Sequence, residues 1–142
     1  MEDMIFRRAH KDEIPRIIAM QTDIFHKEQG IPSDDIDTFM ARKPICWCVE
    51  AAGKIYAATA AWKENGEVHW GRFVVFPAAR GLHIGTRLTR LSFQELFDEG
   101  IDKIYMDARD MTVKIVCGMG GKVDGIPYKF YGGQSFWQKM IL

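Results

Sequence analysis

Apolar positions recur along the chain at two spacings, one typical of helices and one typical of strands. Near the N-terminus, spacings of three, four and seven residues predict a helix, carried by Ile14, Ile17, Ile18, Ile24 and Phe25. Pro15 falls in the first turn of this helix, where its missing N–H does no harm. Gly30 and Pro32 mark the end of the helix, because both residue types interrupt regular structure.

Two shorter elements flank this helix. The segment Met4–Arg8 is predicted to be a short strand. After the helix, Ser33 can cap a second short helix, whose apolar face contains Ile36, Phe39 and Met40.

Three apolar runs in the middle of the chain have the composition of strands. They cover Ile45–Ala51, Ile55–Trp62 and Glu67–Phe76. A glycine-containing turn at Ala52–Lys54 separates the first two, and Asn65-Gly66 is a strong hairpin signal between the second and third. The three runs are therefore expected to form an antiparallel meander.

The pattern changes after Pro77, which ends the third run. Apolar residues at helical spacing then predict a helix over Ile84–Phe97, stopped by Gly100 and followed by a strand at Ile101–Asp107. A strand, a turn, a helix and a strand make a βαβ unit, whose two strands pair in parallel.

The C-terminal part is expected to complete one domain. Asp110 can cap a further helix, and Gln134–Leu142 is predicted to be the last strand. The predicted fold class is α+β, a mixed sheet in which an antiparallel meander is followed by a βαβ unit. With 142 residues and no linker-like segment, a single domain over residues 1–142 is expected.

Composition narrows the class of protein. Lys plus Arg and Asp plus Glu both number 19, so the basic excess of a typical nucleic-acid-binding domain is missing and we expect no nucleic-acid partner. No apolar run approaches the roughly 20 residues that span a bilayer, so no membrane partner is expected. An odd number of cysteines, Cys46, Cys48 and Cys117, argues against a disulfide framework and indicates a reducing compartment, so a cytoplasmic protein is expected. Cys46 and Cys48 have no second cysteine pair to complete a metal site, so no zinc site is expected.

The segment Phe73–Leu88 carries the clearest chemical signal. An apolar strand runs into a turn of small residues, and that turn opens a helix. Backbone N–H groups of such a turn can converge on one point, and the helix N-terminus adds a partial positive charge, which together suit a phosphate group. The alternative is an ordinary turn between a strand and a helix, with Arg80 solvated.

This segment resembles the signature of the GNAT superfamily of acyl-CoA-dependent N-acyltransferases. That signature is Arg/Gln-x-x-Gly-x-Gly/Ala, following a strand that often ends in Val-x-Pro. Here Val75-Phe76-Pro77 precedes Arg80-Gly81-Leu82-His83-Ile84-Gly85, in which Arg80 and Gly85 match and His83 replaces the middle glycine. Histidine adopts unusual backbone conformations more readily than a β-branched residue does. The order of elements along the whole chain also looks like that of the family.

The resemblance implies acetyl-CoA as co-substrate, bound in a V-shaped opening between the fourth and fifth strands, and no metal. Backbone groups of the fourth strand would pair with the pantetheine arm, and amides of the turn would bind the pyrophosphate. The cofactor-binding residues expected on this basis are Phe73, Val74, Val75, Arg80, Gly81, Leu82, His83, Ile84, Gly85, Thr86 and Asp110. Asp110 enters this set because it stands where the family's next motif has asparagine.

Catalytic residues follow from the same resemblance. In one register Cys117 stands where the family has a tyrosine that protonates the leaving thiolate, and in the neighbouring register Val116 stands there. Cys117 could act as a weak acid or simply pack in the core. His69 lies where some members have a catalytic glutamate, and histidine titrates near neutrality, which suits a general base. A buried, inert histidine is the alternative, and Glu67 on the same strand face is the rival base.

The sequence therefore predicts an N-acetyltransferase that moves an acetyl group from acetyl-CoA to an amine of a small molecule or peptide by direct attack. Phe25, Glu28 and Gln29 are candidate acceptor contacts, because the end of the first helix usually covers the acceptor site in the family. A catalytically weak or inactive CoA-binding regulatory module is the alternative, motivated by His83 and Cys117. A homodimer is left open, since members of the family often dimerise.

Overall fold

The computed structural model describes residues 3–29, 39–81, 83–109, 122–129 and 136–141. Its helices and strands are β1 (Ile5–Arg8), a 3-10 turn (Lys11–Glu13), α1 (Ile14–Gln29), β2 (Ile45–Ala51), β3 (Lys54–Glu64), β4 (Glu67–Val75), a second 3-10 turn (Pro77–Ala79), α3 (Ile84–Asp98), β5 (Ile104–Arg109), β6 (Lys122–Lys129) and β7 (Phe136–Ile141). Most of the helix predicted after Ser33, and all of the one predicted after Asp110, lies outside the described residues.

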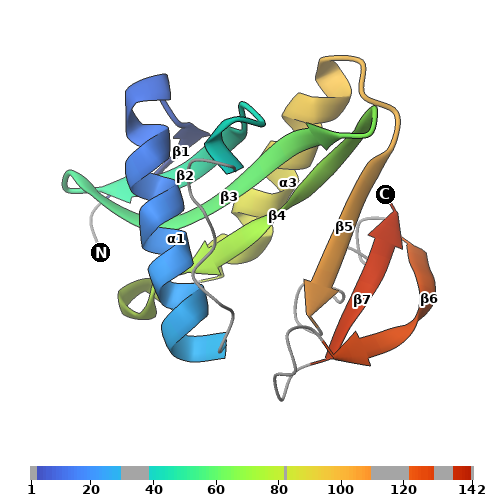
Figure 1. Ribbon diagram of the computed structural model, residues 1–142. Helices are drawn as coiled ribbons and strands as arrows, with labels where there is room; N and C mark the ends of the chain where they lie inside the picture. Colours follow the sequence, from blue (N-terminus) through green and yellow to red (C-terminus); the bar gives the residue numbers. More distant parts are fainter. Residues whose placement is uncertain (1–2, 30–38, 82, 110–121, 130–135, 142) are drawn as a thin grey trace.

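The described strands form one mixed sheet in the order β1-β2-β3-β4-β5-β7-β6 (Figure 1). Neighbouring strands are antiparallel from β1 to β4, parallel between β4 and β5, and antiparallel from β5 through β7 to β6. The parallel pair is joined through α3, as a βαβ unit requires. The predicted mixed fold is thus confirmed, with an antiparallel meander followed by a βαβ unit.

The sequence did not predict β6. This strand contains Gly125 and Pro127, two residue types that rarely occupy strand interiors. Its register with β7 shifts between Asp124 and Tyr128, so the glycine and proline fall at an irregularity of the ladder. Such an irregularity accommodates a proline that cannot donate a backbone hydrogen bond, and this explains why the composition did not indicate a strand.

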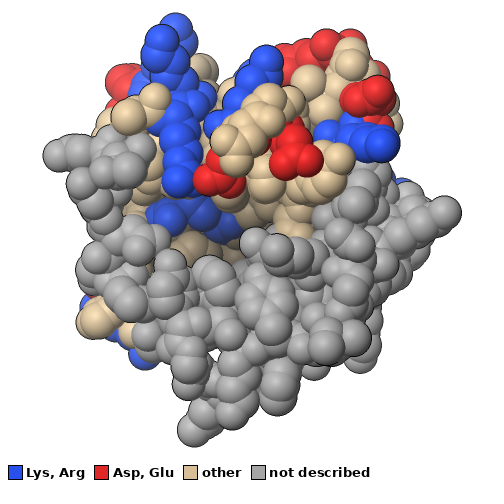
Figure 2. All heavy atoms as spheres, turned by 45° about the vertical axis from the view of Figure 1, so that its right-hand side comes forward, with Lys and Arg blue, Asp and Glu red and all other residues tan. Residues whose placement is uncertain are grey.

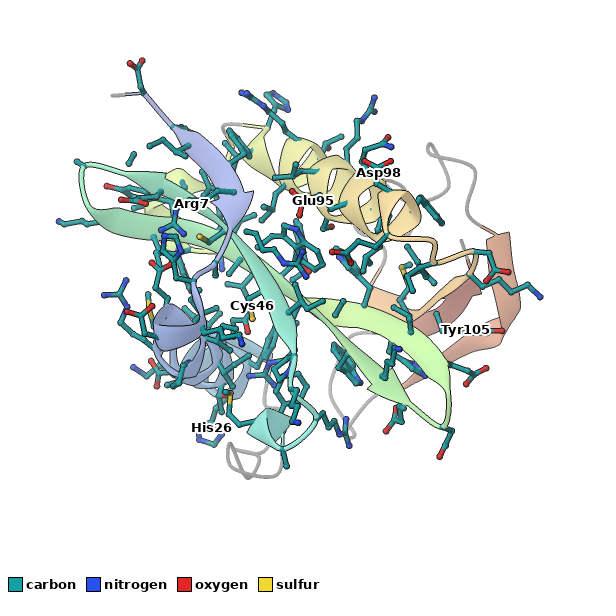
Figure 3. The ribbon with its side chains drawn as sticks, turned by 90° about the horizontal axis from the view of Figure 1, so that it is seen from above. Arg7, His26, Cys46, Glu95, Asp98 and Tyr105 are labelled. Carbon is teal, nitrogen blue, oxygen red and sulfur yellow. The ribbon has the colours of Figure 1, made fainter. Side chains whose placement is uncertain are left out.

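Helices α1 and α3 cover opposite faces of the sheet (Figure 3). On the α1 face, the buried side chains of Ile17 and Ile18 pack with Cys46 and Cys48 of β2. On the α3 face the core contains, among others, Trp47, Trp70, Leu88, Phe93 and Ile104. Both indoles of that face are satisfied: Trp47 donates to Glu95 Oε1 at 3.0 Å, and Trp70 donates to Ser92 Oγ at 2.9 Å.

Strand β4 contains a bulge at its centre. Ala60 pairs with Gly71 and Ala58 pairs with Val74, so two residues of β4 face one residue of β3. Arg72, one of those two, has a φ of 51°, in the left-handed region that residues with a Cβ rarely adopt. The Thr59 hydroxyl, opposite the bulge, donates to the Gly71 carbonyl at 2.9 Å. The bulge changes the direction of the β4 backbone beside the candidate site.

An ion-pair network fastens β1 to the turn before α1 and predicts a pH-dependent stability. Arg7 donates to Glu13 Oε1 at 2.8 Å and to Glu50 Oε1 at 2.7 Å. The hydrogen bond from Arg7, together with one from the His10 amide, lowers the pKa of Glu13 from 4.5 to about 2. Because the pKa is lower in the folded protein, the stabilisation is complete above about pH 4.5 and is lost as the pH falls towards 2.

We expect Glu13→Gln to lower the free energy of unfolding by about 1–2 kcal/mol at pH 7, the usual effect of losing a charge-assisted hydrogen bond. The deficit should shrink towards zero near pH 2. Urea unfolding of both proteins across this range measures it. Glu99→Gln is a matched control, because Glu99 is 46% exposed in its pair with Arg8 and should contribute less than about 0.5 kcal/mol. A Glu13→Gln deficit that stays constant with pH would refute the assignment.

Candidate functional site

Strands β4 and β5 pair over only a short length. The parallel ladder between them consists of Val68 with Ile104 and His69 with Tyr105. Beyond Tyr105, β5 continues in register with β7, and beyond His69 the described partners of β4 belong to β3. The two strands diverge from this point in Figure 1. Within the described residues, the β5-facing backbone of the second half of β4 therefore has no strand partner.

The turn that follows β4 contains two residues in the left-handed region, Gly81 and His83. Gly81 has a φ of 84°, a conformation that favours glycine. His83 has φ 58° and ψ 22° and immediately precedes α3. His83, at the middle position of the motif, thus adopts an unusual backbone conformation of the kind that histidine tolerates more readily than a β-branched residue does. Leu82, between them, lies outside the described residues.

The N-terminus of α3 is left open to solvent. His83 makes no side-chain cap to the helix, and the first turn contains no acidic residue. The side chains of His83 and Thr86 are exposed, whereas Ile84 and Leu88 are buried and fix the helix on the sheet. The first amides of this 15-residue helix, with their partial positive charge, can therefore interact with an anion.

Gly85 packs closely against two side chains of β4, Phe73 and Val75. A Cβ added at Gly85 would lie 2.8 Å from Phe73 Cζ and 3.6 Å from Val75 Cγ2. Phe73 and Val75 therefore form the wall beside the turn, while the buried Val74 side chain points to the α1 core. Of these three predicted strand residues, Val74 can offer a ligand only its backbone.

Arg80 directly follows the 3-10 turn Pro77–Ala79. Its Nε donates to the carbonyl of Val75, the last residue of β4, at 2.9 Å. The guanidinium is thereby held beside the turn that contains Gly81 and His83. A cation in this place adds to the field of the helix N-terminus.

On the α1 face, His69 lies at the point where β4 and β5 separate. Its ring stacks on Trp62, with centroids 6.2 Å apart, and lies 5.8 Å from the Tyr105 ring. Its Nε2 is 3.6 Å from Glu67 Oε1 and 3.8 Å from Glu64 Oε2. The structure thus brings the two rival bases together, with His69 23% exposed at the strand junction and Glu67 45% exposed at the hairpin end.

This arrangement of strands and turn matches a known family. Residues 14–113, more than half of the chain, match the acetyltransferase (GNAT) family. The chain belongs to the GNAT family. No curated protein sequence matches it.

Solved structures share the GNAT fold over nearly the whole chain. Escherichia coli ElaA has a TM-score of 0.79 at 17% identity, covering 99% of both chains. The ribosomal-protein-S18-alanine N-acetyltransferase from Escherichia coli has 0.76 at 14% identity, covering 99% of this chain and 93% of its own. The spermidine N-acetyltransferase from Vibrio cholerae, in complex with CoA and spermine, has 0.73 at 12% identity, covering 98% and 94%. At these identities the likeness shows the fold.

Arg72 and Gln21 lie beside the candidate site of this GNAT domain, and the sequence did not identify either as a candidate. Arg72, at the bulge, lies on the α1 face with its guanidinium 4.7 Å from the Phe39 ring and 5.5 Å from the Phe25 ring. Gln21 of α1 is completely buried and hydrogen-bonds to Arg72. Phe25, a candidate acceptor contact, is buried beside Arg72, and the side chains of Glu28 and Gln29 are not described. A signal for Arg72 existed, since it is a cation in the second half of a strand whose following residues, Phe73 to Val75, are all apolar.

The two cysteines of β2 are buried and do not form a metal site with other described residues. Burial raises the pKa of Cys46 to about 12 and that of Cys48 to about 11, so both are neutral thiols at physiological pH. In the part of the chain that the structure describes, no group of three or more His, Cys, Asp or Glu could hold a metal ion. Asp110 and Cys117 lie outside the described residues.

The described surface of the GNAT domain carries mixed charge. Figure 2 shows Lys and Arg interspersed with Asp and Glu on the visible face. None of the described helices is long and apolar enough to cross a membrane.

Proposed function

We propose that the protein transfers an acetyl group from acetyl-CoA to an amine of a small molecule or a peptide by direct attack. The observation that carries the proposal is the continuity of one backbone surface. Beyond His69, no described strand pairs with the β5-facing edge of β4. This edge runs into a turn with left-handed Gly81 and His83, and the turn opens the N-terminus of α3, which the His83 side chain does not cap. An extended chain that ends in a pyrophosphate, as the pantetheine arm of CoA does, fits that surface.

The substrate would lie with its pantetheine along Phe73, Val74 and Val75 and with its pyrophosphate at the turn. Amides of Gly81 to Thr86 would donate to the phosphate oxygens, Leu82 among them, and Arg80 would neutralise charge beside them. Asp110 is proposed as a further contact of the cofactor. This arrangement places the thioester near the bulge of β4.

In the reaction the acceptor nitrogen attacks the thioester carbonyl carbon and forms the new C–N bond. The C–S bond then breaks and its electron pair leaves with the CoA sulfur. We assign His69 as the base that takes the amine proton, directly or through water, because it lies at the junction of β4 and β5 on the α1 face. Cys117 or water would return a proton to the thiolate.

Proteins of the same fold and the groups around His69 both support an amine as the acceptor. Proteins of this fold acetylate quite different amines, a ribosomal protein's alanine in one case and spermidine in another. The aromatic rings of Trp62 and Tyr105 flank His69, and the carboxylates of Glu64 and Glu67 lie beside it. Both features are compatible with a cationic amine that approaches from the α1 face.

Calorimetric titration with acetyl-CoA tests the proposal. We expect micromolar binding, and much weaker binding of acetyl-pantetheine, which lacks the pyrophosphate that the turn would hold. Spermidine and peptides with a free N-terminal alanine or a lysine should then be assayed for release of the CoA thiol. No binding at millimolar acetyl-CoA would overturn the proposal, and tight binding without thiol release would indicate a regulatory module.

A further inference from the structure

A reciprocal pair of hydrogen bonds fastens α1 to the bulge of β4. Gln21, in the middle of α1 and 0% exposed, donates from Nε2 to the carbonyl oxygen of Arg72. Its Oε1 accepts from Arg72 Nε at 3.2 Å. The buried amide of Gln21 therefore contacts both the backbone and the side chain of the bulge residue. We call these two hydrogen bonds the Gln21–Arg72 clasp.

Helix α1 also holds the guanidinium of the clasp. Arg72 Nη2 donates to the Ile18 carbonyl at 3.0 Å and to Thr22 Oγ1 at 2.6 Å. The rings of Phe25 and Phe39 pack against it. Together, these hydrogen bonds and ring contacts explain how Arg72 maintains a φ of 51° inside a strand, although it has a Cβ.

The clasp fixes the direction of one particular amide. In a trans peptide, the carbonyl of one residue and the N–H of the next point in opposite directions, and the described residues contain no cis peptide. Since the Arg72 carbonyl points to Gln21, the Phe73 N–H points away from α1. Phe73 has no register partner on β3, and its ring lies against Gly85 beside the phosphate turn.

We infer that Gln21 is a positioning residue for acyl transfer: it orients the Arg72–Phe73 peptide so that the Phe73 N–H can donate to the thioester carbonyl oxygen. The inference rests on the proposed function. Negative charge develops on that oxygen as the amine attacks, and a donor held in place beforehand stabilises it. Gln21 itself touches no substrate and acts from the opposite side of the peptide.

Gln21→Glu tests the inference with almost no change in shape. The carboxylate can still accept from Arg72 Nε, but it has no N–H for the Arg72 carbonyl and places an oxygen against it. We expect kcat to fall about tenfold or more, while KM and Kd for acetyl-CoA stay within about twofold, because the turn that binds the pyrophosphate is untouched. Gln94→Glu, the same change at an exposed position of α3, should leave kcat as in the wild type.

A second variant covers the case of a protonated glutamate. Gln21→Met removes both hydrogen bonds of the clasp at similar volume and should lower kcat at least as much. Thermal unfolding of both variants shows whether the fold persists. A wild-type kcat in folded Gln21→Met, or an equal loss of acetyl-CoA affinity and kcat, would overturn the inference.

A readout on the free protein separates this inference from the proposed function. The ¹H–¹⁵N resonance of the Phe73 amide should shift in Gln21→Glu and stay in place in Gln94→Glu. If the wild type binds no acetyl-CoA, the proposed function fails, whereas the Phe73 resonance still shows whether the clasp orients that peptide. An unchanged Phe73 resonance in both Gln21 variants would refute the clasp whatever the turnover.

Discussion

Gly85→Val is expected to weaken acetyl-CoA binding by about 100-fold or more, equivalent to about 2.8 kcal/mol, while the protein remains folded. The added Cβ would lie 2.8 Å from Phe73 Cζ, closer than a Cβ approaches another heavy atom. Since Cζ is the far end of a flexible side chain, the ring can move and the fold can survive. The displaced Phe73 ring would then enter the space proposed for the pantetheine arm.

A second effect adds to the first. Gly85 lies in the first turn of α3, whose amides are proposed to bind the pyrophosphate. A β-branched side chain there narrows the approach of the phosphate to the backbone. Calorimetry with acetyl-CoA measures the loss, and circular dichroism with thermal unfolding shows whether the fold is intact.

A double-mutant cycle isolates the contact. Gly85→Ala adds only the Cβ and should weaken binding less than Gly85→Val does. Combining it with Phe73→Leu, which shortens the side chain that the Cβ meets, should restore part of the lost affinity, so the two effects should not add. If Gly85→Val bound acetyl-CoA as the wild type does, the phosphate turn would be wrongly assigned.

Gly85 shows which features of the candidate site the sequence can predict and which it cannot. The motif placed Gly85 among the residues expected to bind the cofactor, and the structure adds that this glycine allows close approach of Phe73. The conformation of the turn could be predicted because it depends on the types of its own residues. Gly81 and His83 both tolerate positive φ. Contacts between distant segments, such as Gly85 with Phe73, depend on packing that periodicity does not encode.

Gln21 shows the same limit on the α1 face. It occupies a position of the apolar helix face, three residues after Ile18 and four before Phe25. A polar residue at such a position indicates a specific buried hydrogen bond, because an unsatisfied amide there would be costly. The sequence could not name Arg72 as the partner, since the two residues are 51 positions apart and meet only through the bulge.

The sheet was predictable where strands are regular. The meander from β2 to β4 follows from alternation and from the Asn65-Gly66 hairpin, whose two residues both have positive φ. Where the ladder is irregular the patterns failed: β6 was missed because of Gly125 and Pro127. The bulge at Arg72, the irregularity closest to the site, was not predicted either.

His69→Gln is expected to lower kcat with a preferred amine by about 100-fold, the usual contribution of a general base. Its effect on Kd for acetyl-CoA should be small, because His69 lies on the α1 face and the phosphate turn lies at the other end of β4. Steady-state kinetics of CoA release and calorimetry measure the two quantities.

Glu67 provides the decisive comparison. Its carboxylate is 3.6 Å from His69 Nε2 but lies at the exposed hairpin end of β4, two residues farther from the bulge. Glu67→Gln should therefore lower kcat less than about fivefold, and the exposed His10, replaced by Gln as a matched control, should change nothing. A large loss in Glu67→Gln with a small one in His69→Gln would make the carboxylate the base and leave the histidine as the stacked partner of Trp62. Equal and large losses would instead show that the two residues work as one unit, with Glu67 orienting the imidazole that removes the proton.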